Sequence, residues 1–168
     1  MLHNCIFSAQ NSFGVIKMQL TQKETLLLKD LKGEEQLCID KYTKHASAAL
    51  DGQLKDLFTK LANTEQSHLN MLTQIENGTA PAIGGASQSV SLAFTETYGM
   101  GETPDKKADC YLCTDLLATE KHASGLYDTC VFEFKDKQLR DVLNHIQKEE
   151  QQHGKYIYDY MTKNNMYS

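Results

Sequence analysis

The stretch TEQSHLN, residues Thr64–Asn70, decides how the chain is interpreted. The apolar residues around it recur every three or four positions, as on the buried face of a helix: Leu54, Leu57, Leu61, Leu72 and Ile75. Glu65 and His68 occupy the two positions of this series where leucine is expected. Because burying one ion costs several kcal/mol, the pair is either a solvated surface pair or part of a polar site inside a helical core.

The composition is that of a helical protein with an acidic balance. The 168 residues include only two prolines and no tryptophan, and the formal net charge is -5. No segment concentrates Lys and Arg, and no apolar run approaches the ~20 residues needed to cross a membrane, so we expect neither nucleic-acid nor membrane binding. The N-terminal segment lacks the pattern of a secretory signal, and we expect the protein to be cytoplasmic when it is made.

Four helical segments can be placed from the apolar residues that recur along one helix face and from the capping residues at the helix starts. They cover residues 21–49, 51–77 and 105–134, and the last begins at Asp136. We expect the inward positions to be Leu28, Leu31, Glu35, Cys38, Tyr42, Ala46 and Ala49 on the first, Leu112, Leu116, Glu120, Ala123, Tyr127, Val131 and Phe134 on the third, and Leu139, Val142, Ile146, Glu150, His153, Ile157 and Tyr160 on the fourth. Thr21 and Glu24 form a capping box, Asp51 and Asp136 can cap the second and fourth helices, and Thr103-Pro104 is a start signal for the third.

These segments predict one all-α domain preceded by an arm. Residues 1–20 show no sustained periodicity, and we expect a flexible N-terminal arm there. Residues 21–168 form the domain, with a hairpin at 21–77, a Gly/Ser/Thr-rich crossover at 78–103 and a second hairpin at 104–164. Short, long and short connections predict a four-helix bundle with one long crossover, which is the ferritin-like arrangement.

An internal repeat identifies which polar residues belong together. A shift of 85 residues superposes the two predicted hairpins. The matching pairs are Glu35 with Glu120, Tyr42 with Tyr127, Asp51 with Asp136, Glu65 with Glu150, and His68 with His153. The repeat also selects Glu35 over its neighbour Glu34, and Glu150 over its neighbour Glu149, because only the selected residues have glutamate partners.

The repeated residues should meet at one level of the bundle. Glu35 and Glu65 are equally distant from position 50, so both lie roughly 22 Å from the first turn at about 1.5 Å per residue. Glu120 and Glu150 are equally placed about position 135. If the hairpins pack together, six candidate metal ligands converge: Glu35, Glu65, His68, Glu120, Glu150 and His153.

This set of residue types indicates a dinuclear metal site. Two divalent cations would balance four carboxylates, and one Glu from each of two helices plus Glu-x-x-His from each of the others is the ligand pattern of di-iron and di-manganese proteins. Iron and manganese suit the ligands equally, and zinc is a possible occupant of purified protein. The alternative is a relic site whose acids are protonated or hydrogen-bonded to one another.

The remaining reactive side chains receive simpler interpretations. We expect Tyr42 and Tyr127 to pack in the core and to hydrogen-bond a ligand carboxylate. His45, His122 and His145 lack partners in the repeat and are assigned to the surface or rim. The cysteines are expected to be reduced core residues of a cytoplasmic protein. Cys110-x-x-Cys113 has no second pair to complete a zinc site.

The two hairpin sequences resemble the coat F domain family, the ferritin-like proteins named after spore coat protein F. The resemblance lies in residues 26–72 and 115–161, most closely in ATEK, KQLRDVL and KEEQQH of the second hairpin. It implies a four-helix ferritin-like fold, a final location in the spore coat and contacts with other spore coat proteins. It also implies that the ligand pattern of this superfamily falls on the six residues named above.

Two functions remain open at this point. The first is a metal-dependent activity that handles peroxide or oxidises Fe(II), with no particular residue assigned as catalytic. The second is a structural role in the coat, without catalysis. A homodimer formed through a bundle face is compatible with both.

Overall fold

The computed structural model describes residues 18–83 and 92–167, which form four α-helices. The helices are α1 (Gln22–Ala48), α2 (Gly52–Glu76), α3 (Pro104–Glu133) and α4 (Lys137–Lys163). The described residues contain no strand, and the predicted all-α, four-helix class is confirmed. Residues 1–17 of the expected arm, with Cys5, lie outside the described residues.

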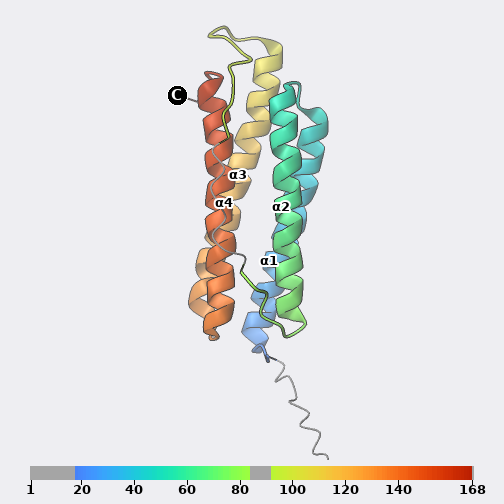
Figure 1. Cartoon of the computed structure of the whole chain (residues 1–168), viewed down its shortest axis with the longest axis vertical. Coiled ribbons are helices and arrows are strands. Elements are labelled where there is room, and N and C mark those ends of the chain that lie inside the picture. Colours follow the sequence, from blue (N-terminus) through green and yellow to red (C-terminus); the bar gives the residue numbers. More distant parts are fainter. Residues whose placement is uncertain (1–17, 84–91, 168) are drawn as a thin grey trace, which may run out of the picture.

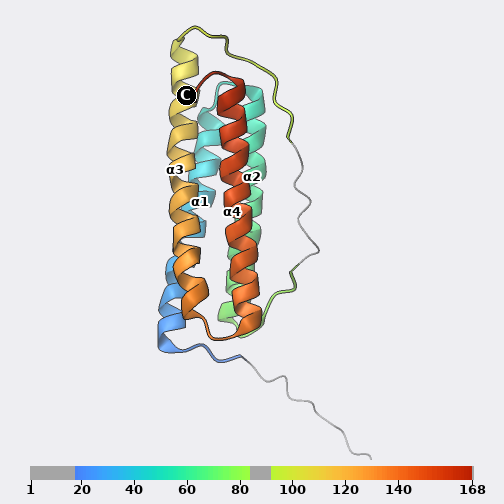
Figure 2. The same ribbon diagram turned by 90° about the vertical axis from the view of Figure 1, so that its left-hand side faces the viewer.

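The helices form a bundle of two antiparallel hairpins. α1 packs against α2 and α3 packs against α4, while α1–α3 and α2–α4 contacts join the hairpins. The α1–α2 turn and the α3–α4 turn lie at opposite ends of the bundle (Figure 1). The connection between α2 and α3 therefore leads from one end of the bundle to the other (Figure 2). None of the described helices combines the length and the apolar character that a membrane span requires.

The caps expected from the sequence hold the start of every helix. Thr21 and Glu24 bond reciprocally as a capping box, with Glu24 Oε2 2.7 Å from the Thr21 amide nitrogen. The Thr103 hydroxyl oxygen accepts from the Lys106 amide. Asp51 and Asp136 each accept from amides in the first turn that follows them. These bonds satisfy amides that otherwise have no partner at a helix start.

The apolar core is divided into two clusters. One contains Leu54, Phe58 and Tyr160, and the other contains Leu28, Leu72 and Ile146. The predicted inward positions of α1, α2 and α4 are all buried. The separation has a direct cause, because the charged residues of the repeat occupy the layer between the two clusters.

The predicted inner face of α3 needs a correction at its ends. Leu112 and Val131 are half-buried, and Cys113 and Cys130 take the inner positions instead. Cys113 precedes the buried Leu116 by three residues, and Cys130 follows the buried Tyr127 by three, so the cysteines continue the spacing of a buried helix face. The described cysteines form no disulfide with one another; Cys38, Cys113 and Cys130 are buried, and Cys110 is partly exposed.

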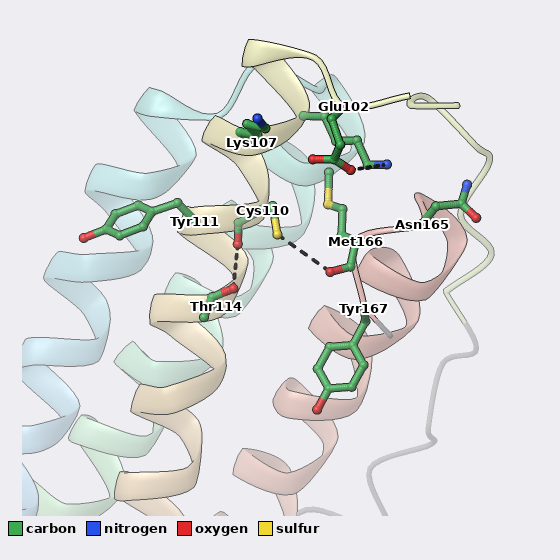
Figure 3. Close-up of a pocket in the computed structure, with 9 residues that line it drawn as sticks. Glu102, Lys107, Cys110, Tyr111, Thr114, Asn165, Met166 and Tyr167 are labelled. Carbon is green, nitrogen blue, oxygen red and sulfur yellow. Dashed lines mark hydrogen bonds and ion pairs between the residues drawn. The ribbon is translucent and has the colours of Figure 1, made fainter. Parts of the chain in front are cut away.

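Cys110 and Cys113 lie in different surroundings. Cys110 lines a surface pocket of about 550 Å³ between the start of α3 and the C-terminal segment, where its Sγ lies 3.8 Å from the Met166 carbonyl oxygen (Figure 3). Cys113 is fully buried, and burial raises the pKa of its thiol far above the usual value. A thiol of this kind is unreactive, which fits its role as a core residue.

The end of the crossover is attached to the bundle by polar contacts. The Gln53 side chain accepts from the Thr95 amide at 2.9 Å, and the Asn164 side chain accepts from the Thr97 amide at 2.8 Å. Phe94 packs edge-on against Tyr160, with 5.5 Å between ring centroids. These contacts hold the crossover against α2 and α4.

Each hairpin also supplies a buried acid that holds the turn of the other. Asp109 of α3 accepts from the amides of Leu50 and Asp51 in the α1–α2 turn, both at 2.9 Å. Glu24 of α1 accepts from the Lys135 amide in the α3–α4 turn, also at 2.9 Å. Because Glu24 and Asp109 are 85 residues apart, these exchanged contacts follow the repeat.

Asp109→Ala should destabilise the bundle by about 3 kcal/mol, because two turn amides lose their buried carboxylate partner. The melting temperature should fall by roughly 6–12 °C in a thermal denaturation followed by circular dichroism. Asp105→Ala is the matched control, since Asp105 is an exposed acid of the same helix start. Equal melting temperatures for the two variants would contradict the assigned role of Asp109.

Candidate metal centre

The six predicted ligands come together between the four helices. α1 contributes Glu35 and α3 contributes Glu120, while α2 and α4 each contribute a Glu-x-x-His pair: Glu65 with His68, and Glu150 with His153. All six side chains are at least 97% buried. The three-residue spacing places each Glu and His on one helix face, and the antiparallel hairpins bring these faces to the same height.

The first group of ligands surrounds the inner ring nitrogen of His68. Nδ1 of His68 lies 2.9 Å from Glu150 Oε1, 3.0 Å from Glu65 Oε2 and 3.6 Å from Glu35 Oε2. One ligand atom from each of these four residues lies within 4.8 Å of all the others. This spacing suits a single cation.

The second group surrounds His153 in the corresponding way. Nδ1 of His153 lies 2.8 Å from Glu65 Oε1, and 3.7 Å from both Glu120 Oε2 and Glu150 Oε2. These four residues also place ligand atoms within 4.8 Å of one another. The two imidazole rings are stacked, with 5.7 Å between their centroids.

Glu65 and Glu150 belong to both groups, and each turns one oxygen toward each imidazole. Glu35 and Glu120 belong to one group each. The arrangement thus offers two adjacent positions with two shared carboxylates between them. Such sharing is what a pair of cations a few ångströms apart requires.

The two tyrosines bind the outer oxygens of the unshared glutamates. The hydroxyl of Tyr127 donates to Glu35 Oε1, and that of Tyr42 donates to Glu120 Oε1. Each tyrosine therefore contacts the glutamate of the other hairpin. A separation of seven residues, about 10 Å along a helix, puts the glutamate of its own helix out of reach.

Several inner atoms of the cluster are buried and make no well-aligned hydrogen bond, so their polar contacts are the ion-pair contacts between the carboxylates and the imidazoles. They are Glu35 Oε2, Glu65 Oε1, Glu120 Oε2, both carboxylate oxygens of Glu150, and His153 Nδ1. Buried oxygens without a well-aligned hydrogen bond are costly, and here they converge on two small volumes. The donor set and its orientation therefore fit two divalent cations.

Contacts with the imidazoles separate the four buried acids into two classes. Burial and the charge of Glu150 raise the pKa of Glu35 to about 8 and the pKa of Glu120 well above its usual value. Burial acts in the same direction on Glu65 and Glu150, but hydrogen bonds from the imidazoles outweigh it and lower the pKa of both. These surroundings thus favour the protonated form of the unshared acids and the ionised form of the shared acids.

The histidines hold protons as well. Burial alone would lower the pKa of His153, but its contacts with Glu150 and Glu65 raise that pKa to about 10. Burial would also lower the pKa of His68, but hydrogen bonds with the surrounding glutamates raise that pKa well above its usual value. With both imidazoles and both unshared acids protonated, the metal-free centre would be neutral, and two divalent cations would replace these four protons without changing the net charge.

The sequence-based prediction left Glu149 and His145 out of the site, but the structure places Glu149 beside His68 and His145 beside Glu149. Glu149 Oε2 lies 2.9 Å from the outer ring nitrogen of His68 and 3.5 Å from His145 Nε2. The repeat favoured Glu150, which the structure places in the inner groups, but it could not identify a contact that only one hairpin makes. His145, Glu149 and His153 follow one another at intervals of four on α4, and this spacing was the available signal.

The other two unassigned histidines lie away from the cluster. His122 is mostly exposed, with Nε2 3.8 Å from Glu34. His45 is partly buried and lies 2.8 Å from Asp115 Oδ2. Both serve the α1–α3 contact or its edge, in keeping with a position at the surface or rim.

Fold and centre together define a ferritin-like four-helix bundle with a carboxylate–histidine cluster. A ferritin-like domain of a two-domain protein from Anabaena variabilis, which also has a DJ-1/ThiJ/PfpI-like domain, aligns with a TM-score of 0.64 and 15% identity. The alignment covers 90% of this chain and 40% of that one. A dodecameric thioferritin, the bacterioferritin-related protein of Bacteroides fragilis, aligns with a TM-score of 0.58 and 20% identity over 87% of this chain and 88% of the other.

The particular family is indicated by the second hairpin. Residues 108–168 match the family model of the Coat F domain, which confirms the resemblance of the second hairpin; the match does not include the first hairpin. The matched segment contains Glu120, Glu150 and His153 and extends past the end of α4. A search of curated proteins found no match.

The metal-free protein should become less stable as the pH rises from 5 to 8. The pKa of Glu35 is about 8 in the folded protein and 4.5 in the unfolded chain. The pKa of His153 is about 10 in the folded protein and 6.5 in the unfolded chain. The folded state binds more protons in this window, so the melting temperature in chelator should fall by at least about 5 °C.

The double variant Glu35→Gln, Glu120→Gln provides the control, because glutamine resembles the protonated acid at any pH. Its melting temperature should depend less on pH than that of the parent protein. A melting temperature of the metal-free parent that stays constant or rises between pH 5 and 8 would contradict the assignment.

Proposed function

We propose that this protein binds two divalent metal ions, iron or manganese, and uses them in oxidation–reduction chemistry on peroxide or Fe(II). The observation that carries the proposal is the pair of overlapping clusters that share Glu65 and Glu150. Among the described residues, their inner carboxylate oxygens contact only the two imidazoles within ion-pair distance, and they lie in a core with almost no solvent exposure. A bundle that needed only stability would fill this layer with apolar side chains.

The ligand types narrow the choice of metal. Carboxylate oxygens and imidazole nitrogens suit iron, manganese and zinc, whereas a site for a soft metal would use thiolates. The two described clusters consist of glutamate and histidine alone. Iron and manganese provide the redox change that the proposed chemistry needs, and zinc would be a substitute without activity.

Each residue of the centre has a distinct part in this proposal. Glu65 and Glu150 would contribute to holding both ions, and His68 and His153 would each hold one of them. Glu35 and Glu120 close the outer sides, where the tyrosine hydroxyls hold their second oxygens in place. When bound, the metal ions supply the electrons and the positive charge that reaction with peroxide, or oxidation of Fe(II) by dioxygen or peroxide, requires.

The likeness to the Coat F domain supports a role in the spore coat. We infer that the protein is made in the cytoplasm, joins the coat and contacts other coat proteins there. The thioferritin from Bacteroides fragilis is a dodecamer, which supports self-association of this bundle, with a homodimer as the simplest form. The alternative function, a structural coat component with a structural or relic metal site, is favoured by the neutrality of the metal-free centre.

Protein expressed with added iron or manganese should contain about two metal ions per chain by elemental analysis. Glu65→Gln should reduce this to less than about one, because both positions lose a shared carboxylate. Glu76→Gln, an exposed acid on the same helix, should bind as much metal as the parent protein. A parent protein with less than about 0.2 equivalents of iron, manganese or zinc would overturn the metal proposal.

The loaded protein should convert hydrogen peroxide to water and dioxygen, or accelerate Fe(II) oxidation, and Glu65→Gln should lower the rate by at least about 100-fold. Peroxide loss and dioxygen release would be followed together, with Glu76→Gln again as the control. Equal rates for the parent protein and Glu65→Gln, with two metals bound in the parent, would favour the structural alternative.

A further inference from the structure

We propose that Glu149 is a positioning residue that makes the two metal positions unequal, so that the His68 position binds its ion first and more tightly. The inference rests on the proposed two-metal function. It adds an order of occupancy and a residue outside the six ligands that determines this order.

The contact that supports the inference lies on the outer side of His68. The Nδ1 atom of this ring faces Glu35, Glu65 and Glu150, and its Nε2 atom lies 2.9 Å from Glu149 Oε2. The carboxylate of Glu149 is partly buried, with a side-chain exposure of 18%. His68 is therefore held from both sides, and its ring orientation is determined before any ion binds.

A carboxylate on the outer nitrogen changes what the inner nitrogen can do. When the Nε2–H group of His68 donates to Glu149, the lone pair of Nδ1 is directed into the cluster. The negative charge of the carboxylate also makes the ring a stronger electron donor. Both effects favour a cation at the His68 position. Glu149 is itself held from the surface side by His145, whose Nε2 lies 3.5 Å from Glu149 Oε2.

The repeat places different residues at the corresponding position of the other half. A shift of 85 residues takes Glu149 to Thr64 and His145 to Lys60. The hydroxyl of Thr64 donates to the carbonyl oxygen of Lys60, 3.3 Å away on its own helix. A neutral hydroxyl engaged in this way cannot supply His153 with the charged partner that Glu149 supplies to His68.

The experiment titrates metal-free protein with Mn²⁺ under anaerobic conditions by calorimetry, with electron paramagnetic resonance at one equivalent. The parent protein should bind in two steps that differ by roughly 10- to 100-fold, the usual effect of such an outer carboxylate. At one equivalent most Mn²⁺ should then be magnetically isolated, because the second position is still free. Magnetically coupled Mn²⁺ pairs at one equivalent would mean that the two metal positions fill together.

Glu149→Gln keeps a hydrogen-bond acceptor of the same shape but removes the charge, and it should weaken the first step until the two steps merge. Glu34→Gln is the matched control, because Glu34 is also a buried acid beside a ligand glutamate but pairs with His122. Thr64→Glu should tighten the second step by supplying His153 with a carboxylate. His153→Ala should retain the tighter step, and His68→Ala should lose it.

The possible outcomes separate this inference from the function on which it rests. Failure of the parent protein to bind Mn²⁺, Fe²⁺ or Zn²⁺ would remove the two-metal function itself. Two bound ions with equal affinities, or steps that stay apart in Glu149→Gln, would overturn the role of Glu149 and leave that function intact. Retention of the tighter step in His68→Ala would overturn the proposed order.

Discussion

The structure depends on one costly arrangement, which is the burial of four carboxyl groups and two imidazoles in a single layer of a helical bundle. The layer divides the apolar core into two clusters, so neither cluster can form the whole core alone. Four protons would keep the layer neutral without metal, and two divalent cations would do so in their place. Fold stability and the proposed metal binding therefore draw on the same six side chains.

The two hairpins are joined by exchanged contacts as well as by apolar packing. Tyr42 and Tyr127 each bind a glutamate of the opposite hairpin, and Glu24 and Asp109 each hold the opposite turn. These contacts lie in the middle and at both ends of the bundle. They determine the register between the hairpins, and this register sets the distance between the two halves of the cluster.

Much of the fold and the inner cluster could be predicted because both follow local patterns. The caps, the apolar helix faces and the 85-residue repeat predicted the helices and singled out Glu65 rather than a surface acid. A contact that breaks the repeat could not be predicted in this way, and Glu149 has no glutamate counterpart. A hydrogen bond from each tyrosine to a ligand carboxylate was expected, but its exchange between the hairpins depends on which helix faces which. The cysteines were expected in the core, yet Leu112 and Val131, the more apolar residues, were placed on the inner face of α3 in the positions that Cys113 and Cys130 take.

The repeat has a consequence for how such a centre can be assembled. Each hairpin supplies one unshared glutamate, one Glu-x-x-His pair and one tyrosine, which is half of everything the cluster contains. Two identical hairpins related by a two-fold axis would build the same cluster at their interface, so the bundle is equivalent to a symmetric dimer within a single chain. Joining the halves in one chain allows each half to change separately. The presence of Thr64 at the repeat position that corresponds to Glu149 is a difference that two identical hairpins could not have.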